Sequence, residues 1–177
     1  MTTIIFESHA TSLDNESKLC SGWNDVDVSK KGLQEAAELG ERYGSKLPDV
    51  VFCSDLLRSY KTAALAFKNT GVPILIDDRL RECDYGTMTK SAKTLVEEHK
   101  MAHLTEPFPG GESYQQATTR MKHFLDDIRR AASGKTIMII GHRATQYGLE
   151  VHINNKQLEA VVSEPWQWQP GWTYNLL

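Results

Sequence analysis

Short apolar runs alternate along the chain with longer segments of helical periodicity. Apolar runs at residues 4–6, 50–53, 74–76 and 136–140 predict four strands, and residues 174–176 fit a further strand at an edge of the sheet. The runs are continuously apolar rather than alternately polar and apolar. This pattern is typical of strands that are covered on both faces.

The intervening segments carry apolar residues three and four positions apart, which is the spacing of one helix face. Ser29 and Asp55 are predicted to cap two of these helices, because their side chains accept hydrogen bonds from free N–H groups of the first turn. Further helices are predicted at residues 91–103, from Ser113 onward, and at residues 145–153. The buried face of the helix after Ser29 is predicted to carry Leu33, Ala36, Ala37, Leu39 and Tyr43.

The alternation of strands and helices predicts an α/β fold with three α/β/α layers around a mostly parallel central sheet. A chain of 177 residues has the length of one domain, so residues 1–177 are expected to form a single one. In folds of this kind the functional site lies beyond the carboxyl ends of the strands. The residues that follow each predicted strand are therefore the place to look for chemistry.

Composition and charge narrow the possible functions. A net charge of −3 argues against a surface for nucleic acid or anionic membrane, so any anion site is expected to be local. No apolar run approaches the roughly 18 residues of a membrane span. The three cysteines form no Cys-x-x-Cys pair and suit free thiols in a reducing compartment, which indicates a cytoplasmic protein. The sequence leaves the oligomeric state open, a homo-oligomer included.

Chemically active side chains follow the predicted strands. The segment "ESHATS" carries His9 and "CSDLLR" carries Arg58, while "DDRLRECDYG" carries Glu82 and "IIGHRAT" carries His142. Two histidines at equivalent ends of separate strands are much less expected by chance than one. These side chains are therefore expected to converge on one pocket.

In these segments the chain resembles the histidine phosphatase superfamily, which is also called phosphoglycerate-mutase-like. "SHATSLDN" stands where the family has Arg-His-Gly-x-Thr followed by Asn, and "SGWNDVDVSKKG" is similar to its Gly-Trp-x-Asp…Ser-x-x-Gly segment. "CSDLLRSYKTA" resembles Ser-x-Leu-x-Arg-Ala-x-x-Thr-Ala, and "RLRECDYG" resembles Leu-x-Glu-x-x-x-Gly. "GGES" and "IIGHRAT" complete the set. Each motif alone is a weak signal, but six in the family's order form a strong one.

The resemblance implies an activity and a role for each pocket residue. His9 takes the position of the nucleophile that forms a phosphohistidine, and Glu82 that of the general acid and base. Arg58 and His142 take positions that contact the phosphate. The implied substrate is a small phosphorylated molecule, and no metal or cofactor is implied. The candidates for further substrate contacts are Ser8, Asn15, Ser21, Gly22 and Arg143.

The chain departs from the family pattern around its first motif. Ser8 stands where the family has arginine, and Ala10 replaces the following glycine. Arg143 stands where the family usually has glycine after the second histidine. We therefore predict that Arg143 turns into the pocket and restores the charge that is missing at Ser8.

Two other functions remain open from the sequence. The loss of an arginine is compatible with a weak or inactive relative that binds a phosphorylated metabolite or another anion. Retention of His9 and Glu82 favours an enzyme, because a binding module needs neither a nucleophile nor an acid. A phosphoglycerate-type mutase uses the same groups, but the short connection between Glu82 and Gly111 leaves little chain for a covering cap. A metal-independent phosphatase is the prediction.

Other conspicuous residues are predicted to be structural. His99 and His103 lie four apart, but no third ligand completes a metal site. His123 and His152 match no motif and are expected on a helix surface or in packing. The tail tryptophans, Trp166, Trp168 and Trp172, are expected to pack in the core or at the sheet edge rather than to form a stacking platform.

Overall fold

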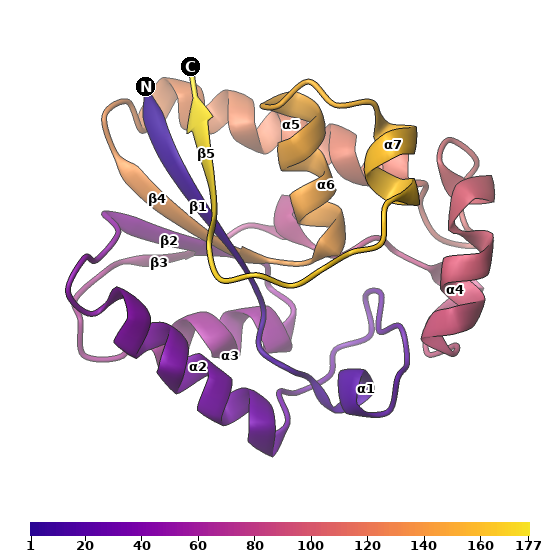
Figure 1. The fold of residues 1–177 in the computed structure, drawn as a ribbon, viewed down its shortest axis with the longest axis horizontal. Helices are drawn as coiled ribbons and strands as arrows, with labels where there is room; N and C mark the ends of the chain where they lie inside the picture. Colours follow the sequence, from indigo (N-terminus) through magenta and orange to yellow (C-terminus); the bar gives the residue numbers. More distant parts are fainter.

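A computed structural model, which describes residues 1–177, contains one five-stranded sheet (Figure 1). Its strands are β1 (Thr2–Ser8), β2 (Val50–Cys53), β3 (Ile74–Ile76), β4 (Thr136–Gly141) and β5 (Trp172–Leu176). Their order is β3-β2-β4-β1-β5, and only β5 runs antiparallel to its neighbour. The predicted, mostly parallel central sheet is confirmed.

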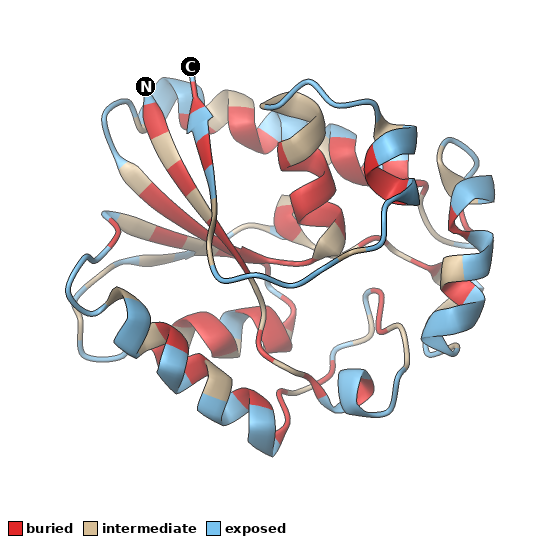
Figure 2. Ribbon diagram, viewed as in Figure 1, coloured by how far each residue is buried: buried red, intermediate tan, exposed pale blue.

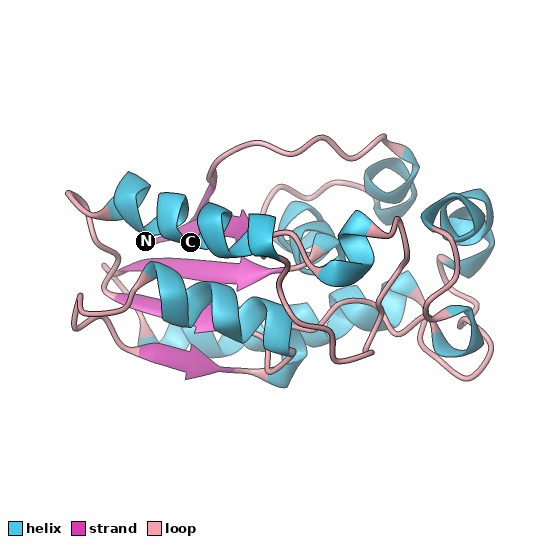
Figure 3. Ribbon diagram, turned by 90° about the horizontal axis from the view of Figure 1, so that it is seen from below, coloured by secondary structure: helices cyan, strands magenta, loops and turns pink.

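Helices cover both faces of this sheet, so the three predicted layers are confirmed (Figures 1 and 3). One face carries α2 (Lys30–Tyr43) and α3 (Leu57–Ala66), and the other carries α5 (Tyr114–Ala131) and α6 (Arg143–His152). The remaining helices are α1 (Leu13–Glu16), α4 (Lys93–His99), α7 (Leu158–Ser163) and the 3₁₀ turns Asp78–Leu80, Gly86–Met88 and Lys100–His103. No helix combines the length and the apolar character needed to cross a lipid bilayer.

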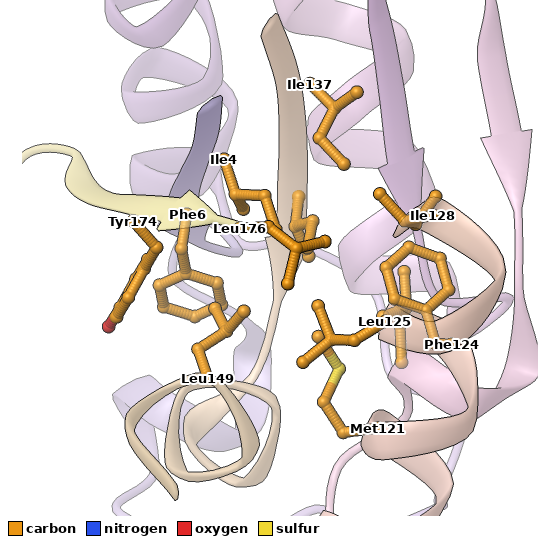
Figure 4. Close-up of a cluster of buried hydrophobic side chains, with 12 residues drawn as sticks. Ile4, Phe6, Met121, Phe124, Leu125, Ile128, Ile137, Leu149, Tyr174 and Leu176 are labelled. Carbon is orange, nitrogen blue, oxygen red and sulfur yellow. The ribbon is translucent and has the colours of Figure 1, made fainter. Parts of the chain in front are cut away.

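The central strand β4 shows how one sequence supplies both layers of the core. Ile137 and Ile139 pack with Phe124 of α5, in the cluster drawn in Figure 4. Met138 and Ile140 point to the opposite face, toward α2 and α3. Because side chains alternate along a strand, the continuous apolar run fills both interfaces. Figure 2 shows the resulting band of buried residues along the sheet and the inner faces of the helices.

The buried face of α2 differs from the prediction. Ser29 caps the helix as predicted, since its side chain accepts the N–H of Gly32. However, Leu33 is 42% exposed and Ala37 is also exposed. The reason lies at Gly32, where an added Cβ would stand 2.1 Å from the carbonyl oxygen of Thr11. This close approach of the β1–α1 loop turns the Gly32 side of the helix inward and the Leu33 side to solvent.

The predicted cap of α3 at Asp55 is wrong. The N-cap residue is Leu56, which has no side-chain cap, and the N–H of Leu57 bonds to the carboxylate of Asp25 instead. Asp55 forms an ion pair with Arg81. A charged partner brought close by the fold has outcompeted the local capping bond.

Two predicted helices have different bounds in the structure. The segment at 91–103 contains α4 and then a separate 3₁₀ turn rather than one continuous helix. The helix predicted from residue 145 begins two residues earlier, at Arg143. This earlier start matters, because it places the first turn of α6 directly at the carboxyl end of β4.

Candidate active site

A cleft of about 660 Å³ opens at the carboxyl ends of β1 and β4. It is lined by residues of the sheet, of α2, α3, α4 and α6, and of the loops that follow the strands. Every candidate site residue from the sequence lies in its wall: Ser8, His9, Asn15, Ser21, Gly22, Arg58, Glu82, His142 and Arg143. The expected convergence of the strand ends is therefore found in the structure.

His9 follows the last residue of β1, and its backbone N–H donates to the carbonyl of Gly141. Its ring Nδ1 lies 2.7 Å from the carbonyl oxygen of Ala10. A carbonyl only accepts, so Nδ1 carries the proton and Nε2 keeps its lone pair. Removal of water from the ring, together with the positive charge of Arg58, lowers the pKa of His9 to about 3. The imidazole is consequently neutral, with an unprotonated Nε2.

His142 stands at the end of β4 and is 1% exposed. Its ring centroid lies 5.0 Å from that of His9. Nε2 is 2.7 Å from Oγ of Ser54, a hydroxyl that makes no other side-chain hydrogen bond, while the buried Nδ1 has no partner. Nε2 is therefore engaged with Ser54, and Nδ1 is the ring nitrogen left to contact a ligand. Burial, followed by the charge of Arg58, holds the pKa of His142 well below its usual value.

Arg58 lies in the first turn of α3 and is only 2% exposed. Its guanidinium donates to the carbonyl oxygens of Gly22 and Asn24, at 2.8 and 3.1 Å. Gly22 has a φ of +50°, and an added Cβ there would lie 3.0 Å from Oγ1 of Thr89, so glycine fits this turn best. Carbonyl partners orient Arg58 without neutralising it. Arg58 therefore contributes a full positive charge to the cleft wall.

Glu82 comes after β3 and its following 3₁₀ turn. Its carboxylate Oε1 accepts the backbone N–H groups of Cys83 and Ala144, at 2.9 and 3.0 Å. Ala144 belongs to the first turn of α6, where free N–H groups favour a negative charge. The backbone carbonyl of Glu82 accepts hydrogen bonds from the side chains of Trp23 and Arg120. The carboxyl group is thus fixed by backbone donors and forms no salt bridge.

Arg143 opens α6 and lines the cleft, but its charge is already paired. Its Nη1 forms an ion pair with the carboxylate of Glu97 in α4, and the buried Nε has no hydrogen-bond partner. The Arg143 guanidinium carbon also lies 6.0 Å from the ring centroid of Trp166. In this arrangement Glu97 competes with any anion for Arg143.

Two more of the predicted contact residues lie in the N-terminal segment, Asn15 in α1 and Ser21 in the loop after it. Asn15 lines the cleft, but its Oδ1 accepts the N–H of Ser12 in a capping box at α1. Its amide NH₂ group makes no hydrogen bond within the protein and is free for a ligand. Ser21 is buried beside Gly22 in the loop that Arg58 holds.

Sequence reasoning missed most of the cleft's charged residues, which are Glu7, Lys18, Lys31, Glu35, Glu38, Arg42, Lys93 and Glu97. Most lie on helix surfaces, where charge is common and carries no signal. Glu7 is the exception, because a carboxylate inside an apolar strand is unusual. That residue is 1% exposed and pairs with Arg42.

The two pocket histidines predict that the protein loses stability in acid. Both have pKa values below the ordinary 6.5, so below pH 6.5 the unfolded chain binds protons that the folded chain does not. The contribution of the two histidines to the free energy of unfolding is complete above pH 6.5. It is lost as the pH falls toward their pKa values in the folded protein. The free energy of unfolding should drop by about 1.4 kcal/mol per pH unit for each histidine. Urea unfolding at pH 7, 6 and 5 measures this slope.

The matched variants for this measurement are histidine substitutions inside and outside the cleft. Replacing His9 and His142 together by alanine should flatten the slope between pH 6 and 5. The exposed His123→Ala variant should retain it. Equal slopes in the double variant and the parent would contradict the assignment.

The chain is similar in sequence to two described proteins and similar in fold to a solved structure. Phosphoserine phosphatase 1 of Hydrogenobacter thermophilus is 27% identical over 150 residues, which cover 80% of this chain and 71% of that protein. A 2,3-bisphosphoglycerate-dependent phosphoglycerate mutase 1 of Arabidopsis thaliana is 27% identical, and the match covers 90% of this chain and 60% of the mutase. The solved structure of Bacillus stearothermophilus YhfR superimposes with a TM-score of 0.84 at 24% identity, over 95% of this chain and 87% of that one.

A family model agrees with these likenesses. Residues 4–167 match the model of the Histidine phosphatase superfamily (branch 1). The match begins in β1 and ends in the segment before β5, so it includes every strand end that lines the cleft. The chain belongs to the histidine phosphatase superfamily, branch 1.

Proposed function

We propose that this protein hydrolyses phosphomonoesters of small molecules through a phosphohistidine at His9, without a metal or cofactor. The single observation that carries the proposal is the state of His9. Its Nδ1 proton is held by the Ala10 carbonyl and its Nε2 is unprotonated, beside the buried charge of Arg58. A neutral imidazole nitrogen next to a fixed cation suits attack on a phosphate ester.

The proposed first step forms a bond between His9 Nε2 and phosphorus. The ester P–O bond breaks, and the carboxyl group of Glu82 gives its proton to the departing oxygen. In the second step the Glu82 carboxylate takes a proton from water while the water oxygen attacks phosphorus. The N–P bond then breaks, which releases inorganic phosphate and returns the lone pair to Nε2.

Two fixed groups support the phosphoryl oxygens in this proposal. Arg58 supplies a full positive charge, because its partners are carbonyl oxygens and not carboxylates. In this proposal the free Nδ1 of His142 carries a proton and is a neutral donor, and the hydrogen bond between Nε2 and Ser54 orients the ring. Both are oriented before substrate arrives, which is the requirement for electrostatic stabilisation of a transition state.

With Ser8 at the position of the motif arginine, this site lacks one positive charge of the family pattern. We propose that Arg143 supplies that charge. A hydrogen bond to a charged group contributes about 1.5–3 kcal/mol, or roughly one to two orders of magnitude in rate. Arg143 lines the same cleft and has an unpartnered buried Nε. Arrival of a dianionic phosphate would draw its guanidinium from Glu97 to the phosphoryl oxygens.

Hydrolysis is proposed over transfer between two hydroxyl groups. Between Glu82 and Ser113 the chain forms only α4 and two 3₁₀ turns, Gly86–Met88 and Lys100–His103. A mutase must keep water from the phosphohistidine until the second hydroxyl arrives. This short segment offers little structure for such a cover.

Release of inorganic phosphate from a panel of phosphomonoesters tests the function and the role of Arg143 together. The parent should release phosphate from at least one ester, and Arg143→Ala should reduce kcat/KM about 10- to 100-fold. Glu97→Gln frees Arg143 from its ion pair and should instead lower KM. Tight binding of esters with no phosphate release would favour a non-catalytic binder. Unchanged kinetics in the Arg143 variant would refute the replacement of the missing charge.

A further inference from the structure

The cleft is also lined by residues other than the groups proposed to hold a phosphate. Its far wall is made by α2, through Glu38 and Arg42, and by the segment that joins α7 to β5. We call residues 164–171 the strap. Figure 1 shows the strap crossing in front of the carboxyl ends of the strands, and Figure 2 shows that much of it is exposed. This part of the cleft is where the alcohol portion of an ester would lie.

Trp168 in the strap differs from the prediction that the tail tryptophans pack in the core or at the sheet edge. Trp172 does pack, with its ring 5.5 Å from that of Phe6, and Trp166 donates its indole N–H to Gln146. Trp168 is 56% exposed and lines the cleft. A large aromatic side chain left open in a concave site offers its ring face to a ligand.

Arg42 stands beside this indole in a fixed position. Its guanidinium carbon lies 6.0 Å from the Trp168 ring centroid, and its Nη1 is 2.7 Å from the carboxylate of Glu7. Glu7 is 1% exposed and also accepts the hydroxyl of Tyr43 at 2.8 Å. A buried carboxylate is costly unless it is paired, so Glu7 at the carboxyl end of β1 holds Arg42 at the cleft wall.

The strap packs closely against Glu7 and Tyr43 at Gly171. Gly171 has a φ of +60°, and an added Cβ would stand 2.6 Å from the Tyr43 hydroxyl and 3.6 Å from Oε1 of Glu7. Only glycine fits this approach without displacement. The backbone near Trp168 is thereby held against the same Glu7 group that orients Arg42.

We propose that Trp168, Arg42 and Glu38 form a subsite for a leaving group that carries a hydroxylated ring, either a sugar or a nucleoside. The indole would stack on the ring face, while Arg42 and the carboxylate of Glu38 would bond to ring substituents. Glu38 forms no ion pair and is free to accept from hydroxyl or amino groups. Short acyclic alcohols, such as those of phosphoserine or phosphoglycerate, present no ring face. The subsite rests on the proposed phosphatase function and specifies its substrate class.

The test compares a hexose 6-phosphate, a nucleoside 5′-monophosphate and phosphoserine as substrates. The parent should prefer at least one ring-bearing ester, and Trp168→Ala should reduce that preference on the order of tenfold, mainly through KM. Trp168→Phe keeps an aromatic ring face and should retain most of the preference for the ring-bearing ester. Tyr60→Ala removes an aromatic side chain that is 42% exposed on α3 and outside the cleft, and should leave all three rates unchanged.

The outcomes separate this inference from the proposed function. Loss confined to the nucleotide identifies a base-stacking subsite, and loss confined to the hexose phosphate identifies a sugar subsite. A Trp168→Ala variant that loses activity equally on all three esters, or on none, overturns the subsite and leaves the phosphatase function standing. Absence of His9-dependent hydrolysis of every ester overturns both.

Discussion

Replacing His9 by alanine is expected to lower phosphate release by about 10⁴-fold or more, because in the proposed mechanism the variant lacks the nitrogen that accepts the phosphoryl group. The parent, quenched during turnover of a labelled ester, should carry a phosphoryl group that is stable in base and labile in acid. The variant should carry none. Both measurements report on His9 Nε2, whose lone pair follows from the hydrogen bond between Nδ1 and Ala10.

This loss should occur without a loss of the fold. The His9 side chain makes one hydrogen bond, to the carbonyl of the next residue, and β1 is held by its backbone ladder with β4. Circular dichroism should therefore be unchanged. His152→Ala is the matched control, since that half-buried histidine lies outside the cleft and bonds to the carbonyl of Thr118. Phosphate release from the His9 variant at the parent rate would exclude a phosphohistidine at this position.

The sequence was sufficient to predict the sheet and the convergence of four side chains on one cleft, for a general physical reason. Continuous apolar runs identify strands that are buried on both faces, and parallel strands bring their carboxyl ends to one edge. His9 and His142 directly follow β1 and β4, which are hydrogen-bonded neighbours, so their proximity was implicit in strand order. Arg58 and Glu82 follow β2 and β3 less directly, the first in the opening turn of α3 and the second after the 3₁₀ turn Asp78–Leu80.

The features that the sequence did not predict all depend on partners that only the fold brings together. The local sequence predicts Asp55 as a helix cap, but its carboxylate forms an ion pair with Arg81. The sequence predicts Arg143 as a cation available to the pocket, but it forms an ion pair with Glu97 of α4. Trp168 was expected to pack in the core or at the sheet edge, since nothing in the order of residues shows that the strap lines the cleft. Long-range pairing and the path of irregular segments leave no periodic signal.

Replacing Glu82 by glutamine is expected to reduce kcat for alkyl phosphates by about 10²- to 10⁴-fold, through loss of proton transfer. The substitution preserves geometry, because the amide oxygen of glutamine can still accept the N–H groups of Cys83 and Ala144. A structural effect is therefore small, and the kinetic effect reports on chemistry. Glu150→Gln is the control, since this carboxylate accepts the Tyr174 hydroxyl outside the cleft and should leave turnover unchanged.

The two steps assigned to Glu82 can be separated by the choice of leaving group. The nitrophenolate group of p-nitrophenyl phosphate departs without a proton, so the Glu82→Gln variant should still phosphorylate His9 with this ester. Its second step needs a base for water and should remain slow. Rapid-mixing experiments should therefore show a burst of nitrophenolate near one equivalent of enzyme, followed by a slow steady rate. Equal losses for alkyl and aryl esters, with no burst, would show that Glu82 only positions the substrate.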